Sequence, residues 1–316
     1  MKHTAPIQRS FHDQQGLTMV ELMVAITIGL ILTAGIIQIF ANSKQTYRVE
    51  EALSRVQENG RLALDFIASD IRMASYWGCQ PDSSNIQNDL GAGAGYIDFT
   101  SGGITGAEGG AGVSDSLTLR GADSSPGLTP QPNGGGSTYS TSAATALQVN
   151  LPNDLKAADI VLVSDCTGGD IFQITGADPS AGGVVDHAVG AGSPGNASQL
   201  SKAYQEDASV YYAHEIIYTI KAGSDGQLAL WRSVNGTDQE VVEDVTDLQI
   251  LYGEDMDGDR SVDRYVTADN VSNFDNVYSV HVQLTVQTAD AHTSVITANR
   301  ITRNFSTTVA IRNRVL

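Results

Sequence analysis

An uncharged apolar stretch near the N-terminus constrains this chain more than any other feature. Residues 22–41 contain no Asp, Glu, Lys or Arg, and Glu21 comes directly before them. About twenty helical residues rise roughly 30 Å, which is the thickness of the hydrocarbon core of a bilayer. The polar segment 1–16 holds Lys2 and Arg9, so the positive-inside rule keeps it in the cytoplasm. The sequence therefore predicts one membrane-spanning helix, with the rest of the chain on the far side.

Two simpler interpretations of this stretch account for it less well. A secretory signal peptide has a shorter apolar region followed by an A-x-A-like cleavage site, and no such site follows this run. A plain membrane anchor explains the apolar run but not Glu21, because a carboxylate at the edge of a membrane segment costs about 3 kcal/mol without a partner. Glu21 therefore indicates a function.

The segment Gly16-Leu17-Thr18-Met19-Val20-Glu21-Leu22 resembles the class III signal of type IV prepilins. The resemblance implies that prepilin peptidase cuts between Gly16 and Leu17, and that the new N-terminus on Leu17 is methylated. Many family members have Phe where this chain has Leu17. It also implies that Glu21 acts in subunit assembly, by pairing with the N-terminal amine of a neighbouring subunit. In an apolar environment such a pair is far stronger than in water, and it would fix the stagger between subunits.

An amphipathic pattern continues beyond the apolar run. Apolar or small residues recur at spacings of three or four on one helical face, namely Val49, Leu53, Val56, Gly60, Ala63, Ile67, Ile71 and Ala74. The pattern predicts a helix that packs on a domain, as the outer half of a pilin helix does. We therefore expect a leader at 1–16, a membrane and filament-core helix at 17–43, its amphipathic continuation at 44–78, and a β-rich domain at 79–316.

Short strand-like segments follow, several with alternating apolar and polar residues. The candidates are 96–100, 116–120, 146–150, 160–163, 171–175, 210–220, 228–233, 248–252, 277–287 and 303–311. The sequence Gly-Ser-Asp-Gly at 223–226, between two of them, predicts a hairpin turn. The predicted fold class is α+β and pilin-like, with a long N-terminal helix packed on a mostly antiparallel sheet that carries long loops.

The two cysteines, Cys79 and Cys166, have no C-x-x-C spacing that would indicate a zinc site. They could remain two free thiols, but an exported chain favours a single disulfide. It would tie the end of the helix to the sheet. Closing a loop of this length stabilises a fold by about 4 kcal/mol in the chain-entropy model.

Several further segments resemble the PilW branch of minor pilins. They are YWGC at 76–79, DIVLVSDC at 159–166, IFQIT at 171–175, the acidic cluster after Leu251-Tyr252-Gly253, and TTVAIRNR at 307–314. The resemblance implies a minor pilin that primes pilus assembly and lies at or near the tip. Its implied partners are the major pilin, other minor pilins, prepilin peptidase and the inner-membrane assembly platform. The implied downstream roles are twitching motility, cell adhesion and DNA uptake.

The resemblance also implies a location. The chain would sit in the inner membrane with its C-terminal domain in the periplasm, and then join a pilus at the cell surface. Two alternatives stay open. A type II secretion pseudopilin at the tip of a pseudopilus shares the same leader and plan. A membrane-anchored adhesin would use the loops at 79–145 to grip a ligand.

An acidic loop follows the segment 248–252. Asp255, Asp257, Asp259 and Asp263 occupy positions 1, 3, 5 and 9 of a calcium-loop pattern. The match is partial, since Arg260 and Val266 replace the usual glycine and bidentate acid. A solvated acidic turn explains the same residues. Calcium is therefore a possible ligand, and no other cofactor is indicated.

The charge and the histidines exclude other classes. The net charge of −18 argues against direct binding to nucleic-acid backbones, which needs clustered Lys and Arg. Four histidines of the globular part, His187, His214, His281 and His292, are scattered without an acid or nucleophile at a meaningful spacing. We therefore predict no catalytic residues and no enzymatic activity.

Overall fold

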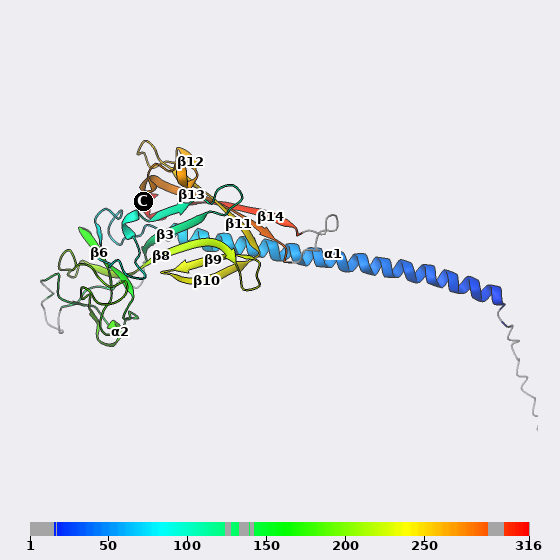
Figure 1. Cartoon of the computed structure of the whole chain (residues 1–316), viewed down its shortest axis with the longest axis horizontal. Coiled ribbons are helices and arrows are strands. Elements are labelled where there is room, and N and C mark those ends of the chain that lie inside the picture. The colour runs from blue at the N-terminus through cyan, green and yellow to red at the C-terminus, as the bar shows by residue number, and fades with distance from the viewer. Residues whose placement is uncertain are drawn as a thin grey trace, which may run out of the picture. The chain divides into compact units, whose positions relative to one another are not determined.

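The computed structural model describes residues 16, 18–123, 128–132, 139, 142–289 and 300–315 (Figure 1). Contacts divide the chain into two compact units, Met1–Glu51 and Ala52–Leu316. Helix α1, Met19–Met73, contributes to both. The long apolar N-terminal helix and the mostly antiparallel β domain confirm the predicted α+β fold class.

The part of α1 in the first unit exposes its apolar side chains. Ile31 is 72% exposed and Ile39 is 71% exposed, and the charged-residue-free stretch between Glu21 and Lys44 is long and apolar enough to cross a membrane. The hydroxyls of Thr27 and Thr33 donate to helical carbonyls one turn earlier. The few polar side chains of this stretch therefore find partners within the helix itself.

The part of α1 in the second unit buries one face. Its buried residues are Val56, Gly60, Ala63, Ile67, Ala68 and Ile71, which confirms the predicted apolar stripe. The helix ends at Met73, so the predicted end at residue 78 is wrong. Ser75 adopts a left-handed φ of 61°, and its N–H donates to the carbonyl of Arg120 at 2.9 Å. The Ser75 N–H therefore bonds to a strand carbonyl instead of to a carbonyl of the helix, and the helix ends.

The larger sheet has eight strands in the order β1-β6-β5-β8-β3-β2, with β9 pairing with β8 and β10 pairing with β9. The strands are β1 (Ile86–Asn88), β2 (Ile104–Ala107), β3 (Ser116–Ala122), β5 (Ile160–Asp165), β6 (Gly168–Gln173), β8 (Ser209–Ala222), β9 (Leu228–Val234) and β10 (Thr237–Glu243). All pairs are antiparallel except β1 with β6. The predicted hairpin joins β8 to β9, where the Gly223 N–H donates to the Gln227 carbonyl.

A second sheet has four antiparallel strands in the order β12-β11-β13-β14. Their bounds are β11 Val245–Glu254, β12 Arg264–Val266, β13 Val277–Gln287 and β14 Thr302–Ala310. Strands β4 (Leu147–Gln148) and β7 (Val184–Val185) form a small third sheet. The short helices are η1 Phe99–Ser101, α2 Pro179–Gly182, η3 Ala268–Asn270, η4 Phe274–Asn276 and α3 Arg312–Val315.

The predicted strand at 96–100 is wrong, because Phe99–Ser101 forms the 3-10 helix η1. The Asp98 side chain accepts a hydrogen bond from the Thr100 N–H at 3.0 Å and so caps this turn. Phe99 is buried through a turn rather than through the alternation of a strand.

The main core lies where α1 meets both larger sheets. It joins Ile67 and Ile71 of the helix to Tyr218 of β8 and to Leu248 and Val282 of the four-stranded sheet. Two further clusters fill the part built on β1, β5 and β6, one around Phe172 and one around Trp77. Residues of both larger sheets therefore share one core with the buried face of the helix.

Candidate functional site

The first turn of α1 holds Glu21 through a reciprocal pair with Thr18. The Thr18 Oγ1 accepts a hydrogen bond from the Glu21 N–H at 3.3 Å, and Glu21 Oε2 accepts from the Thr18 N–H at 3.4 Å. This is a capping box, and it satisfies two backbone donors at the start of the helix. No role was predicted for Thr18, although the spacing Thr-x-x-Glu in the sequence is the signature of a capping box. Glu21 remains exposed.

The predicted processing site lies just before this turn. Gly16 is exposed, whereas Leu17 lies outside the described residues. Cleavage after Gly16 and methylation of Leu17 therefore stay predictions.

In the first unit the helix presents exposed apolar side chains on both sides of Glu21 in the sequence. The large exposed ones are Met19, Val20, Leu22, Met23, Val24, Ile26, Ile28, Leu30, Ile31, Leu32, Ile36, Ile37, Ile39 and Phe40. A contiguous apolar surface of this kind marks a membrane or protein interaction site. The stretch is thus an anchor or an assembly element, and Glu21 is the acidic residue within its first turn.

A disulfide joins Cys79 to Cys166, which confirms the predicted pairing. Cys79 follows the end of α1, and Cys166 lies in the turn between β5 and β6. Asp165 accepts the Lys202 ammonium at 2.6 Å and the Thr167 N–H at 2.7 Å. Burial alone would raise the pKa of Asp165, but these donors hold it below its ordinary value. The turn that carries the disulfide is therefore tied down by charge as well.

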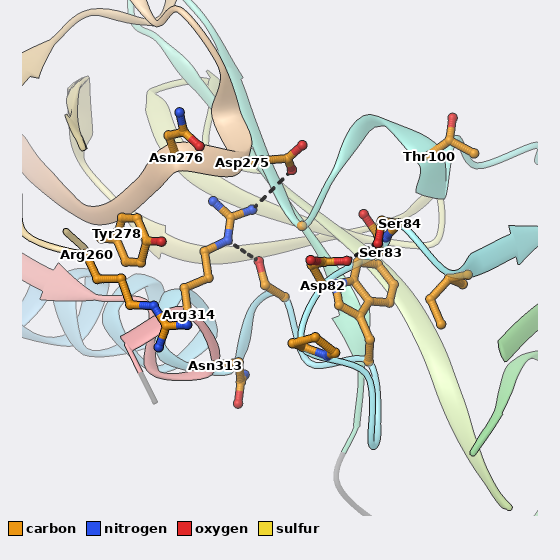
Figure 2. A pocket seen from close by; sticks show the side chains of 15 residues that line it. Asp82, Ser83, Ser84, Thr100, Arg260, Asp275, Asn276, Tyr278, Asn313 and Arg314 are labelled. Carbon is orange, nitrogen blue, oxygen red and sulfur yellow. Dashed lines mark hydrogen bonds and ion pairs between the residues drawn. The ribbon is translucent and has the colours of Figure 1, made fainter. Parts of the chain in front are cut away.

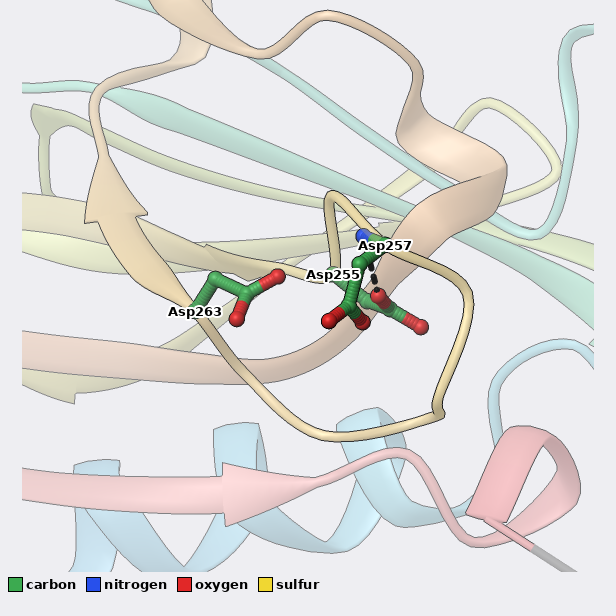
Figure 3. Close-up of side chains that lie close together, drawn as sticks. All are labelled: Asp255, Asp257 and Asp263. Atoms are coloured by element: carbon green, nitrogen blue, oxygen red, sulfur yellow. Dashed lines mark hydrogen bonds between the residues drawn. The ribbon is translucent and has the colours of Figure 1, made fainter.

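The acidic loop connects β11 to β12 and gathers three carboxylates (Figure 3). Oxygens of Asp255, Asp257 and Asp263 all lie within 4.8 Å of one another. Asp259 is not part of this group, and its carboxylate accepts the Ser261 N–H at 2.7 Å instead. The structure thus brings together three of the four residues predicted for calcium.

Backbone donors shape this loop. The buried Asp255 carboxylate accepts N–H bonds from Asp257, Gly258 and Arg260 at 2.7–3.0 Å. Burial would raise the pKa of Asp255, but these donors hold it below its ordinary value. Arg260 adopts a left-handed φ of 67°, at the position where calcium loops usually carry glycine. The loop therefore adopts the left-handed conformation at this position with an arginine in place of glycine.

A buried acid fixes the base of the same loop. Glu254 is fully buried and accepts Arg264 Nη2 at 2.8 Å and the backbone N–H groups of Ser272 and Asn273 at 2.8 and 3.0 Å. These donors lower its pKa against the opposing effect of burial. Glu254 is therefore committed to the fold, and the three clustered aspartates are the groups that could hold a cation.

Two protein families match separate parts of the chain. The family described as Prokaryotic N-terminal methylation motif matches residues 11–37, which contain Gly16, Thr18 and Glu21. The family described as Type IV Pilus-assembly protein W matches residues 217–313, from β8 to the start of α3. The two matches support a PilW-family type IV minor pilin. No curated protein and no solved structure gives a significant match.

The C-terminal segment that matches the PilW family includes the whole four-stranded sheet and the acidic loop. The resembling segments at 76–79, 159–166 and 171–175 lie outside the match. A pilin family indicates a structural rather than an enzymatic protein.

The end of the matched segment closes on the end of α1. Asn313 Nδ2 donates to the carbonyls of Met73 and Ala74 at 3.2 and 3.0 Å. These are among the last carbonyls of the helix, which have no partner within it. An asparagine distant in the sequence therefore caps helix α1.

Arg314 lines a cavity of about 560 Å³ beside this cap (Figure 2). Its Nε donates to Ser75 Oγ at 3.1 Å, its Nη1 donates to the Val277 carbonyl at 2.8 Å, and Asp275 lies 3.9 Å away. Burial lowers the pKa of Arg314. The guanidinium of Arg314 is therefore held by the chain's own backbone and side chains.

Proposed function

We propose that this PilW-family pilin primes assembly of a type IV pilus together with other minor pilins and lies at or near the pilus tip. Prepilin peptidase would first cut between Gly16 and Leu17, and Leu17 would then be methylated. The observation that carries the proposal is the exposed apolar part of α1 with Glu21 in its first turn. Such a surface needs a covering, first by lipid and then by the helices of other pilins.

Glu21 is suited to select the neighbouring subunit. Its hydrogen bonds to Thr18 measure 3.3–3.4 Å, which is long for such contacts. An ammonium group from the processed N-terminus of a neighbour would compete well for this carboxylate, because opposite charges attract strongly in an apolar environment. Leaving the carboxylate unpaired there is costly, so the pair would favour one stagger between helices.

The other proposed partners are the proteins that the chain would meet on its way from the inner membrane into the pilus. The chain would sit in the inner membrane as a single-pass protein and meet the assembly platform there, with its β domain in the periplasm. It would then enter the pilus with the major pilin and other minor pilins. The size of the second unit, Ala52–Leu316, favours a low-copy cap over a repeated shaft subunit.

The test is Glu21→Gln in the native chain, with Glu58→Gln as the control. Glu58 is exposed on the same helix, in the second unit. We expect E21Q to be processed normally but to lose co-purification with other minor pilins, and the number of surface pili to fall severalfold. E58Q should behave like the native chain.

The readouts separate the two parts of the proposal. Pilus counts test priming, and gold-labelled antibody on intact pili tests the tip location. Label along the shaft would contradict the tip location. Normal pilus numbers in a deletion strain would contradict priming. Normal processing of a Gly16→Asp variant would contradict the assignment of the cleavage site.

We also propose that Asp255, Asp257 and Asp263 bind one Ca²⁺ ion. Three carboxylate oxygens within 4.8 Å repel one another, and a hard divalent cation would relieve that repulsion. Such an ion would brace the β11–β12 connection in the matched C-terminal segment.

A further inference from the structure

Two carboxyl groups lie fully buried against each other away from the sites described above. Asp170 belongs to β6, and Asp89 directly follows β1. Both residues are 0% exposed. The Asp89 N–H donates to the Ile171 carbonyl at 2.8 Å, and the parallel pairing of β1 with β6 sets Gln87 opposite Asp170, so Asp89 lies two residues along the chain from the position opposite Asp170. No ion pair joins either acid to a cation in the part of the chain that the structure describes.

One oxygen of each acid is well supplied with donors. Asp170 Oδ2 accepts the Ser201 N–H at 2.9 Å, the Ser201 hydroxyl at 2.8 Å and the Tyr204 hydroxyl at 2.6 Å. Asp89 Oδ1 accepts from the Ser198 hydroxyl and from Gln87 Nε2. Asp170 Oδ2 thus accepts three hydrogen bonds.

The other oxygen of each acid has no partner. Asp89 Oδ2 and Asp170 Oδ1 are both buried without a hydrogen bond. Both acids bond to the same short segment, Asp89 through Ser198 and Asp170 through Ser201, and the charge of Asp170 acts on Asp89. A buried acceptor without a donor destabilises the fold, and two adjacent ionised acceptors also repel each other. One proton on Asp89 Oδ2, donated to Asp170 Oδ1, would satisfy both atoms.

We infer that Asp89 and Asp170 share one proton, and that this proton locks β1, β6 and the segment 198–204 together in a pH-dependent way. The electrostatics agree with the geometry. Burial raises the pKa of Asp89 to about 6, the Ser198 and Gln87 hydrogen bonds oppose this rise, and the charge of Asp170 adds to it. The proton therefore resides on Asp89.

The other titratable groups nearby do not replace the proton. Lys202 pairs with Asp165 at 2.6 Å and also bonds to Thr167. Burial raises the pKa of Tyr204, so its phenol stays neutral and donates. Calcium would need six or more oxygen ligands, whereas the surrounding hydroxyls direct their hydrogens at the carboxylates.

The sign of the pH effect follows from the raised pKa of Asp89. The unfolded chain releases this proton near pH 4, and the folded chain releases it near pH 6. The stabilisation is complete below pH 4 and is lost as the pH rises through 6. Above that pH two buried carboxylates face each other, so β1 and the segment 198–204 loosen.

The test compares thermal unfolding of the full-length chain in detergent micelles from pH 4.5 to pH 8.5. Asp89→Asn is neutral at every pH, and its amide can donate to Asp170 Oδ1. Asp207→Asn is the matched control, because Asp207 is an exposed acid that follows the same segment. We expect the native chain and D207N to lose several degrees of Tm between pH 5 and 8. D89N should lack that loss and should melt several degrees above the native chain at pH 8.

Further measurements keep the inference testable if D89N folds poorly. Asp170→Asn removes the second carboxylate but leaves Asp89 buried, so its Tm should fall less than that of the native chain between pH 5 and 8. Hydrogen exchange of the Ser201 amide in the native chain, corrected for its intrinsic pH dependence, should quicken above pH 6. A native pH profile in both D89N and D170N would overturn the inference. A chelator that lowers the Tm of the native chain at pH 8 but not that of D89N would also overturn it, because a cation would then hold the pair.

Discussion

Arg232 on β9 donates from its Nε to Oδ2 of Asp70 on α1 at 2.7 Å. The Tyr218 hydroxyl on β8 donates to the same oxygen at 2.6 Å. Burial would lower the pKa of Arg232, but Asp70 raises it above its ordinary value. One carboxylate oxygen thus ties the helix to two neighbouring strands of the eight-stranded sheet.

Asp70→Ala should destabilise the β domain by about 2–3 kcal/mol, because it leaves a largely buried guanidinium and a phenol without their acceptor. Chemical denaturation of the full-length chain in micelles measures the loss. Asp65→Ala is the control, since Asp65 is 72% exposed and lies 3.9 Å from Arg61 on the same helix. A surface pair of this kind contributes at most about 1 kcal/mol. Equal losses in the two variants would contradict a structural role for the Asp70 network.

Gly60→Ala should destabilise the chain, although the same change in an exposed helix usually stabilises by about 1 kcal/mol. A Cβ at residue 60 would lie 2.4 Å from two ring carbons of Phe305 on β14. Overpacking of this kind costs about 1–3 kcal/mol. The exposed Ser69→Ala, on the same helix, should change stability little.

The Gly60 prediction has an internal check. In the double variant Gly60→Ala with Phe305→Leu, part of the loss should return, because a smaller side chain makes room for the new methyl group. Purely additive losses would show that Phe305 is not the neighbour that resists the change.

Replacing both Cys79 and Cys166 with serine should lower the free energy of unfolding by about 4 kcal/mol in the chain-entropy model. The bond spans a sequence separation of 87 residues. A reductant should lower the Tm of the native chain and leave that of the double variant unchanged. Equal sensitivity of both proteins to the reductant would show that another effect is being measured.

Calcium should raise the Tm of the chelator-treated chain, since a ligand that binds only the folded state stabilises it by mass action. The variant Asp257→Asn with Asp263→Asn should lose this response. Asp259→Asn should keep it, because Asp259 lies outside the carboxylate group. Calorimetry measures the binding directly. The absence of both heat and a Tm shift in the native chain would refute a calcium site.

Local sequence patterns predicted the elements that depend on nearby residues. The segment predicted at 277–287 is strand β13, and the Gly-x-x-Gly turn after β8 forms the predicted hairpin. The strand predicted at 96–100 was wrong, because Asp98 caps a 3-10 turn there, and the alternation of apolar and polar residues does not reveal such a cap. β10 was also missed, since its acidic and polar residues lack a clear alternation.

The candidate site also contains parts that the local sequence predicted and parts that it did not. The Gly16 to Glu21 segment is a continuous motif, and the apolar run after it is visible in the sequence alone. Regular spacing in the acidic loop suggested four calcium ligands, but backbone donors turn Asp259 away from the other three. The direction of each side chain depends on the backbone conformation of the folded loop, and the spacing of residues in the sequence does not specify that conformation.

The sequence by itself determined the apolar helix with its early glutamate, the α+β class and the pair of cysteines, because these rest on composition, periodicity and count. Only the tertiary structure decided that the strands divide into two large sheets around one helix and that Asn313 caps that helix. It alone brought the buried acids Asp89 and Asp170 onto the same segment, through Ser198 and Ser201. These contacts join residues far apart in the chain, and they form only when the packing of the whole domain fixes the register of its strands.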